Sequence, residues 1–178
     1  ALLFAADRAD HTERKIKPAL EEGAVVVSDR YVHSSLAYQS RGMNKELDIN
    51  WIEKINRFAL EPDAVIFLDI SPEVGQSRLS NGQVRIKDHS YFENINQQER
   101  IRMVYLEVLN LHDSPLGSEK VVVSQAGVTK VYRVDGVLPV DEVEKIVWRQ
   151  VSSLLKELNV EAEGKDSKVE SLTKFIEE

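Results

Sequence analysis

The sequence predicts an α/β domain in which helices cover both faces of a mostly parallel sheet. The continuous apolar run at residues 24–27, and residues 64–70, which are apolar except for Asp69, have the composition of strands that are buried on both faces. Helical patterns precede, separate and follow these runs, as is typical of parallel sheets. Ligands of such sheets bind at the carboxyl ends of the strands, and Asp29 and Arg30 stand there after the first run.

Composition limits the class of protein. The chain of 178 residues is 42% hydrophobic and 30% charged, which is ordinary for one soluble domain with a real core. With 23 Lys and Arg against 30 Asp and Glu, the net charge of −7 argues against nucleic-acid polymers and anionic membranes as partners. The absence of cysteine excludes disulfides and thiolate metal sites. No membrane-spanning run or signal peptide is visible, so a cytoplasmic location is expected.

The first helix is predicted before residue 23, where apolar residues recur at helical spacing. Phe4 and Arg8 are four positions apart and share one face, where an aromatic plane beside a guanidinium group can hold a planar base. Without a ligand, the same pattern describes a core phenylalanine and a solvated arginine. After the first strand, Ser34 or Ser35 can cap a short helix that carries Tyr38.

A second amphipathic helix is predicted over residues 51–59, with Trp51 and Phe58 in the core. The following strand places Asp69 near its carboxyl end. Ser71 then begins the next helix as its N-cap, with a proline in the first turn.

A basic segment follows, residues 78–88, which contains a glycine and few large apolar groups. Such a segment between two helices fits a lid that closes over phosphates and excludes water. A solvated surface loop has the same composition. If the segment is a lid, its cations Arg78, Arg85 and Lys87 are the candidate phosphate ligands.

The second half of the chain supplies further elements. A helix is predicted to end near residue 112, followed by strands at 120–124 and 129–136, of which the first could be the hairpin partner of the second. The longest amphipathic pattern, residues 140–158, predicts the closing helix, and residues 159–178 form a charged tail.

Two blocks of sequence carry a family resemblance: Leu3-Phe4-Ala5-Ala6-Asp7-Arg8, and Ser28-Asp29-Arg30-Tyr31 with Ser34-Ser35-Leu36-Ala37-Tyr38-Gln39. In order and spacing they resemble the thymidylate kinases, nucleoside monophosphate kinases of the P-loop class, over nearly the whole chain except its tail. The resemblance implies a three-layer P-loop NTPase-type core over residues 1–158 with a lid at about 78–90. It also implies transfer of the ATP γ-phosphate to dTMP, giving dTDP for dTTP biosynthesis, with Mg²⁺ as cofactor and a homodimer as the assembly.

The resemblance also assigns residues of the acceptor site. It implies that Phe4 stacks on thymine, that Arg8 bonds the carbonyl edge of the base and that Ser35 lies near that edge. Tyr38 would lie against the sugar, where a phenol disfavours a 2′-hydroxyl. Gln39 would assist in the same pocket.

The same resemblance assigns the phosphate ligands. Arg30 would hold the acceptor phosphate, and Asp29 would position Mg²⁺ through water or anchor a phosphate-binding neighbour. Arg78, Arg85 and Lys87 would contact the transferring phosphate from the lid, with Arg78 and Arg85 also binding ATP.

One feature of the family is missing from the sequence. None of the eight glycines belongs to a G-x-x-x-x-G-K-[ST] phosphate loop, so the cradle for the ATP phosphates is not encoded here. We therefore expect a further strand-loop-helix unit of at least about 30 residues before Ala1. The 178 residues alone are expected to be inactive and prone to aggregation. Two alternatives remain: a deoxynucleoside kinase, which would use a carboxylate to deprotonate a sugar hydroxyl, and a catalytically inactive nucleotide-binding or interaction protein that lacks the loop.

Overall fold

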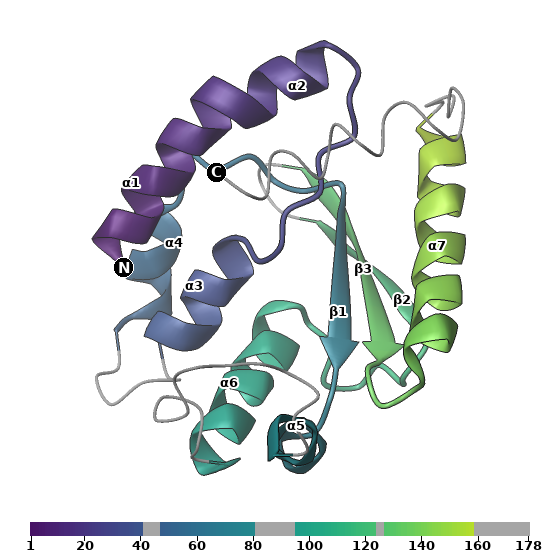
Figure 1. Cartoon of the computed structure of the whole chain (residues 1–178). Coiled ribbons are helices and arrows are strands. Elements are labelled where there is room, and N and C mark those ends of the chain that lie inside the picture. The colour runs from purple at the N-terminus through teal and green to yellow at the C-terminus, as the bar shows by residue number, and fades with distance from the viewer. Residues whose placement is uncertain (41–46, 81–94, 124–126, 159–178) are drawn as a thin grey trace.

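The computed structural model describes residues 1–40, 47–80, 95–123 and 127–158, and Figure 1 shows their arrangement. A three-stranded sheet stands between helix α7 on one side and the remaining helices on the other. The α/β class is therefore confirmed, although the described sheet is small.

The chain begins with one continuous helix in three consecutive parts: α1 (Leu2–His11), η1 (Thr12–Ile16) and α2 (Lys17–Glu21). Pro18 explains the wider turn in the middle, because it has no amide hydrogen to donate to the carbonyl of Arg14. The amide of Lys17 instead donates to the carbonyl of Thr12, five residues back. Gly23, with a φ of 78°, ends the helix as predicted.

The predicted strand at residues 24–27 is wrong. The segment is irregular in the structure, and its last residue, Val27, is 71% exposed. A strand exists only where a neighbouring backbone supplies hydrogen-bond partners, and among the described residues the sheet contains no strand formed by this segment. The apolar run alone could not reveal whether a partner lies beside it.

The sheet has the order β1-β3-β2, with strands β1 (Ala64–Asp69), β2 (Glu119–Val123) and β3 (Val128–Asp135). Strand β1 runs parallel to β3 in a register that pairs Ala64 with Lys130 and Asp69 with Asp135. Strand β2 is antiparallel to β3, so the hairpin partner considered above is present. The described sheet is consequently mixed and not mostly parallel.

Five further helices complete the described fold: α3 (Val32–Gln39), α4 (Ile49–Ile55), α5 (Pro72–Ser80), α6 (Ile95–Val108) and α7 (Val140–Glu157). The predicted cap of α5 is confirmed, since the Ser71 hydroxyl accepts from the Val74 amide at 3.4 Å. The predicted caps of α3 are wrong, because Ser34 and Ser35 lie inside the helix and Tyr31 precedes it. Their hydroxyls are thereby free for contacts outside the helix.

The core lies between the sheet and α6. Leu106, Leu109 and Leu111 pack with Val131 of β3, and a second cluster joins Ala37 of α3 to α6. On the opposite face of the sheet, α7 contacts β3. Helices α3 and α6 are thus layered on one face of the sheet, and α7 covers the other (Figure 1).

The aromatic residues of the α4 region do not enter this core. Trp51 is 38% exposed and Phe58 is 63% exposed, whereas Ile52 is completely buried. The predicted core positions of both aromatic residues are therefore wrong. Helical spacing identified the correct helix, but the short α4 ends at Ile55, before Phe58, and buries only one narrow face.

Leu111 tests this description of the core. The side chain is completely buried, so Leu111→Ala should reduce the free energy of unfolding by about 2–5 kcal/mol through lost burial and a residual cavity. Urea unfolding measures the effect. The control Leu116→Ala, at a residue 51% exposed, should change the unfolding free energy by less than about 0.5 kcal/mol. Equal losses in the two variants would contradict the packing described here.

Candidate functional site

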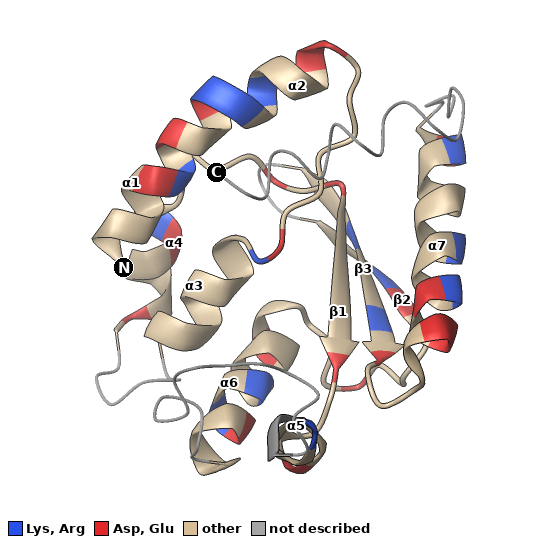
Figure 2. Cartoon of the chain, in the orientation of Figure 1, with Lys and Arg blue, Asp and Glu red and all other residues tan. Residues whose placement is uncertain are grey.

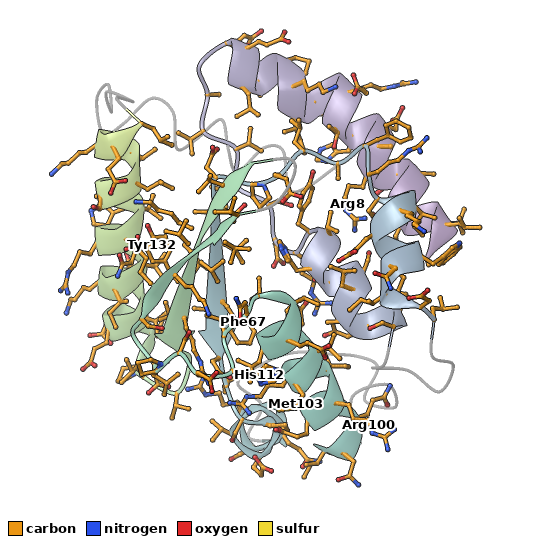
Figure 3. The ribbon with its side chains drawn as sticks, turned by 180° about the vertical axis from the view of Figure 1, so that it is seen from behind. Arg8, Phe67, Arg100, Met103, His112 and Tyr132 are labelled. Carbon is orange, nitrogen blue, oxygen red and sulfur yellow. The ribbon has the colours of Figure 1, made fainter. Side chains whose placement is uncertain are left out.

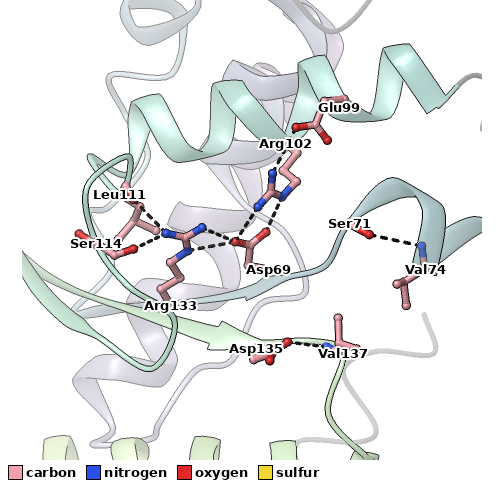
Figure 4. A network of polar contacts seen from close by, with 10 residues as sticks. All are labelled: Asp69, Ser71, Val74, Glu99, Arg102, Leu111, Ser114, Arg133, Asp135 and Val137. Atoms are coloured by element: carbon pink, nitrogen blue, oxygen red, sulfur yellow. Dashed lines mark hydrogen bonds and ion pairs between the residues drawn. The ribbon is translucent and has the colours of Figure 1, made fainter.

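A buried carboxylate marks the carboxyl end of β1. The side chain of Asp69 is only 2% exposed and lies between two guanidinium groups (Figure 4). Arg102 of α6 donates to it through Nε at 2.6 Å and through Nη2 at 3.1 Å. Arg133 of β3 donates through Nε at 2.9 Å and Nη2 at 2.6 Å. These four bonds occupy both carboxylate oxygens, so Asp69 connects three elements and is not available as a base.

The charges around Asp69 decide its protonation. Burial by itself would raise the pKa of the carboxyl, but the hydrogen bonds and positive charges of Arg102 and Arg133 outweigh burial and lower it below its usual value. The bond to Asp69 in turn raises the pKa of Arg102. The group is therefore a fully ionised network at neutral pH.

Two other arginine contacts secure the same region. Arg133 also donates through Nη1 to the carbonyls of Leu111, at 3.3 Å, and Ser114. Arg78 of α5 donates through its two terminal nitrogens to the carbonyls of Gly136 and Val137, both at 2.9 Å. Guanidinium groups thus join the segment after α6 to β3 and the segment after β3 to α5.

A second cluster surrounds Arg8, on the side of α1 that faces α3 and α4 (Figure 3). Its Nη2 donates to the Ser35 hydroxyl at 3.0 Å and to the Tyr31 carbonyl at 3.5 Å. Its Nη1 donates to the side-chain oxygen of Asn56, directly after α4. The guanidinium carbon also lies 5.5 Å from the centre of the Tyr31 ring. Arg8 and Ser35, predicted as neighbours at a base edge, are therefore in contact.

The charge of this cluster comes from arginine and not from histidine. Burial lowers the pKa of His33, and the charge of Arg8 lowers it further. The imidazole is consequently neutral at pH 7. Burial also lowers the pKa of Arg8, an effect opposed by Tyr31 and Asp7. Helix α3 itself carries no Lys, Arg, Asp or Glu (Figure 2).

Arg30 has an unusual backbone conformation beside α3. Its φ of 65° lies in the left-handed region, which is uncommon for residues other than glycine. The Ser28 hydroxyl donates to the Arg30 carbonyl at 2.7 Å and supports this turn. The guanidinium carbon of Arg30 then lies 5.2 Å from the centre of the Tyr38 ring. The two predicted residues Arg30 and Tyr38 are thus side by side, and their arrangement uses backbone strain of the kind found at functional sites.

Tyr105 of α6 connects this cluster to the sheet. Its ring stacks on Phe67 of β1 at 5.5 Å between centres, and its hydroxyl is 2.7 Å from that of Ser34 on α3. Burial raises the pKa of Tyr105, an effect that the bond to Ser34 opposes. The phenol is therefore a neutral hydrogen-bonding group between α6 and α3.

The remaining predicted site residues are less tightly arranged. Phe4 lies one helical turn before Arg8 and is 60% exposed, and Asp29 is exposed beside Arg30. Gln39 is the last residue of α3 and is half-buried. Arg85 and Lys87 lie outside the described residues. Arg78, predicted at the beginning of the lid, belongs to helix α5.

The described residues offer limited metal ligation. Within them, no three His, Cys, Asp or Glu side chains form a group that could hold a metal ion. The exposed carboxylate of Asp29 can serve as one ligand of a Mg²⁺ ion, because this ion keeps several of its waters and needs few protein ligands. None of the helices in the described part is long and apolar enough to cross a membrane.

Sequence reasoning missed the residues that support the site. Asn56, Tyr105, Arg102 and Arg133 were not singled out, since their partners are 48, 71, 33 and 64 positions away in sequence. The available signal was Asp69, a carboxylate at the end of a buried strand, which requires cationic partners.

Comparison with known proteins agrees with the family resemblance of the sequence. The thymidylate kinase family model matches residues 1–120. The chain is 45% identical over 112 residues to a probable thymidylate kinase of Thermococcus kodakarensis, covering 62% of this chain and 51% of the relative. It is 44% identical over 115 residues to a thymidylate kinase of Lactobacillus helveticus, covering 63% and 53%. It is 43% identical over 112 residues to that of Bacillus mycoides, covering 61% and 53%. The chain spans about half the length of the curated relatives it matches.

The network at Asp69 predicts how stability depends on pH. Asp69→Ala should reduce the free energy of unfolding at pH 7 by about 3–5 kcal/mol, because it removes the buried carboxylate that two partly buried guanidinium groups share. The folded state lowers the pKa of Asp69, so below about pH 4 the unfolded chain binds the extra proton and the contribution decreases. Urea unfolding between pH 7 and pH 3 should therefore show the two proteins converging.

The exposed carboxylate of Asp63, just before β1, provides the matched control. Asp63→Ala should change stability by less than about 0.5 kcal/mol at pH 7. A constant difference between wild type and Asp69→Ala down to pH 3 would contradict an ionised, arginine-bound Asp69.

Proposed function

We propose that the chain, which belongs to the thymidylate kinase family, binds dTMP beside α3 and takes part in its phosphorylation by ATP to dTDP. The single observation that carries the proposal is the pairing of Arg8 with Ser35 and of Arg30 with Tyr38 around α3. Arg8 and Arg30 lie beside α3, which has no charged side chain, and Phe4, one turn before Arg8, is exposed; this arrangement suits a ligand with a planar base and an anionic phosphate.

Each residue of the candidate site has a proposed role. Phe4 stacks on the base, and Arg8 donates to its carbonyl edge with Ser35 beside it. Tyr38 lies against the deoxyribose. The exposure of Phe4 supports a stacking role, since 60% of its surface remains open to a ligand. Gln39, at the end of α3, assists in the same pocket.

The proposed chemistry is an in-line phosphoryl transfer. An oxygen of the dTMP phosphate forms a bond to the γ-phosphorus of ATP while the bond to the bridging oxygen of ADP breaks. The attacking oxygen is already ionised and therefore requires no general base. The protein contributes position and positive charge. Arg30 holds the acceptor phosphate, and its position on the Tyr38 ring limits the freedom of its side chain.

Other groups are proposed to bind the phosphates of ATP, the phosphate donor. Mg²⁺, bound through water to Asp29, would neutralise charge between the donor phosphates. Arg78, Arg85 and Lys87 are the proposed ligands of the transferring phosphate. Arg78 is the least favoured of the three, because both its terminal nitrogens already donate to backbone carbonyls. Membership of the family also supports a cytoplasmic homodimer.

An ATP-dependent kinase assay tests the proposal. The intact enzyme that contains this chain is incubated with ATP, Mg²⁺ and either dTMP or thymidine, and ADP and the nucleotide products are separated. We expect dTDP from dTMP and no product from thymidine. Phosphorylation of thymidine alone would favour a deoxynucleoside kinase, and binding of dTMP without turnover would favour an inactive nucleotide-binding protein.

A substitution of Arg30 tests the proposed binding of the acceptor phosphate most directly. Arg30→Ala should lower kcat/KM for dTMP by at least about 100-fold, since it removes a charge-assisted contact to a phosphate in the reacting complex. The control is Arg14→Ala, an exposed arginine of η1 that pairs with Asp10 at 2.7 Å. It should retain the wild-type kcat/KM. Wild-type kinetics in Arg30→Ala would remove Arg30 from the acceptor site.

A further inference from the structure

Asn56 is the buried partner of Arg8. The residue is 6% exposed and follows the last turn of α4, where its backbone N–H donates to the carbonyls of Ile52 and Glu53. Its side-chain Nδ2 donates to the Ile52 carbonyl at 2.7 Å. The side-chain oxygen accepts from Nη1 of Arg8. Both ends of the amide are therefore occupied, one by the helix and the other by the arginine.

The direction of this amide follows from chemistry. The Ile52 carbonyl can only accept a hydrogen bond and the Arg8 guanidinium can only donate, so the Asn56 nitrogen must face the helix and its oxygen must face Arg8. A rotation of the amide by 180° would place two acceptors together and two donors together. Asn56 is thus a fixed acceptor for Arg8.

The contacts of Arg8 leave part of its guanidinium available. Three of its five N–H groups are directed to Asn56, Ser35 and Tyr31 in the described structure. The remaining donors can bind a carbonyl oxygen on a pyrimidine, but they have nothing to offer the amino group that cytosine carries at the same position. Selectivity for the keto base requires that the guanidinium stays in this orientation. A mobile side chain could turn away from the amino group of cytosine, and the unfavourable meeting of two donors would then be avoided.

We propose that Asn56 is a positioning residue that fixes Arg8 and thereby sets the preference for a keto pyrimidine over an amino pyrimidine. The inference rests on the proposed function, because it takes the thymine of dTMP as the ligand of Arg8. Asn56 touches neither base nor phosphate and acts through Arg8 alone.

Binding of dTMP and dCMP, measured by calorimetry on the whole protein without ATP, tests the proposal. Wild type should prefer dTMP, and Asn56→Ala should reduce the ratio of the two dissociation constants about tenfold. Asn56→Asp keeps an acceptor facing Arg8 but loses the donor to Ile52, so it should retain the preference while unfolding at a lower urea concentration. Asn50→Ala, on the same helix and in contact with Asp48, is the matched control and should leave the ratio unchanged.

A double-mutant cycle separates positioning from a general structural effect. If Asn56 acts through Arg8, then Asn56→Ala should change the ratio less than about twofold in an Arg8→Ala background. An equal loss of preference in both backgrounds would overturn the proposal, as would an unchanged ratio in Asn56→Ala alone.

The orientation of Arg8 is also measured without any nucleotide. The ¹⁵N signals of the guanidinium, identified by their loss in Arg8→Lys, should report slowed rotation in wild type and faster rotation in Asn56→Ala. Unchanged rotation would overturn the positioning role itself. A wild-type protein that binds neither nucleotide would instead overturn the proposed function and with it the base preference, even if the rotation responds as expected.

Discussion

The buried carboxylate of Asp69 is the constraint on which the rest of the structure depends. A carboxylate that is 2% exposed must be paired, because an isolated buried charge costs more than the fold can tolerate. Its two partners come from different elements, Arg102 from α6 and Arg133 from β3. The requirement to satisfy one side chain therefore fixes how α6 lies on the sheet. The apolar packing of Leu106 of α6 with Val131 of β3 supports the same placement.

Helix α6 is also connected to the candidate site around α3. One turn after Arg102, Tyr105 stacks on Phe67 and meets the hydroxyl of Ser34. Helix α3 is thereby held against α6, with Ala37 buried between them. Ser35 follows Ser34 directly and reaches Arg8. A continuous series of contacts thus leads from the end of β1 to the guanidinium of Arg8 on α1.

Sequence reasoning succeeded where the deciding interactions are local. The helix before Gly23, the Ser71 cap and the common face of Phe4 and Arg8 all depend on residues within about one turn, which spacing reveals. It failed where the outcome depends on distant partners. Residues 24–27 have strand composition but no described neighbour with which to pair, and Phe58 follows a helix too short to bury it. The network at Asp69 was missed for the same reason, since its arginines are 33 and 64 residues away.

The electrostatics of the candidate site around α3 follow from which elements supply its cations. Helix α3 has no charged side chain, so the positive charge at its surface is supplied by Arg8 from α1 and by Arg30 from the preceding turn. Each guanidinium lies over a tyrosine ring, which holds it without neutralising it. This differs from the network at Asp69, where a carboxylate cancels arginine charge. Burial and the charge of Arg8 also lower the pKa of His33, so its imidazole is neutral at pH 7 and the positive charge beside α3 comes from Arg8 and Arg30.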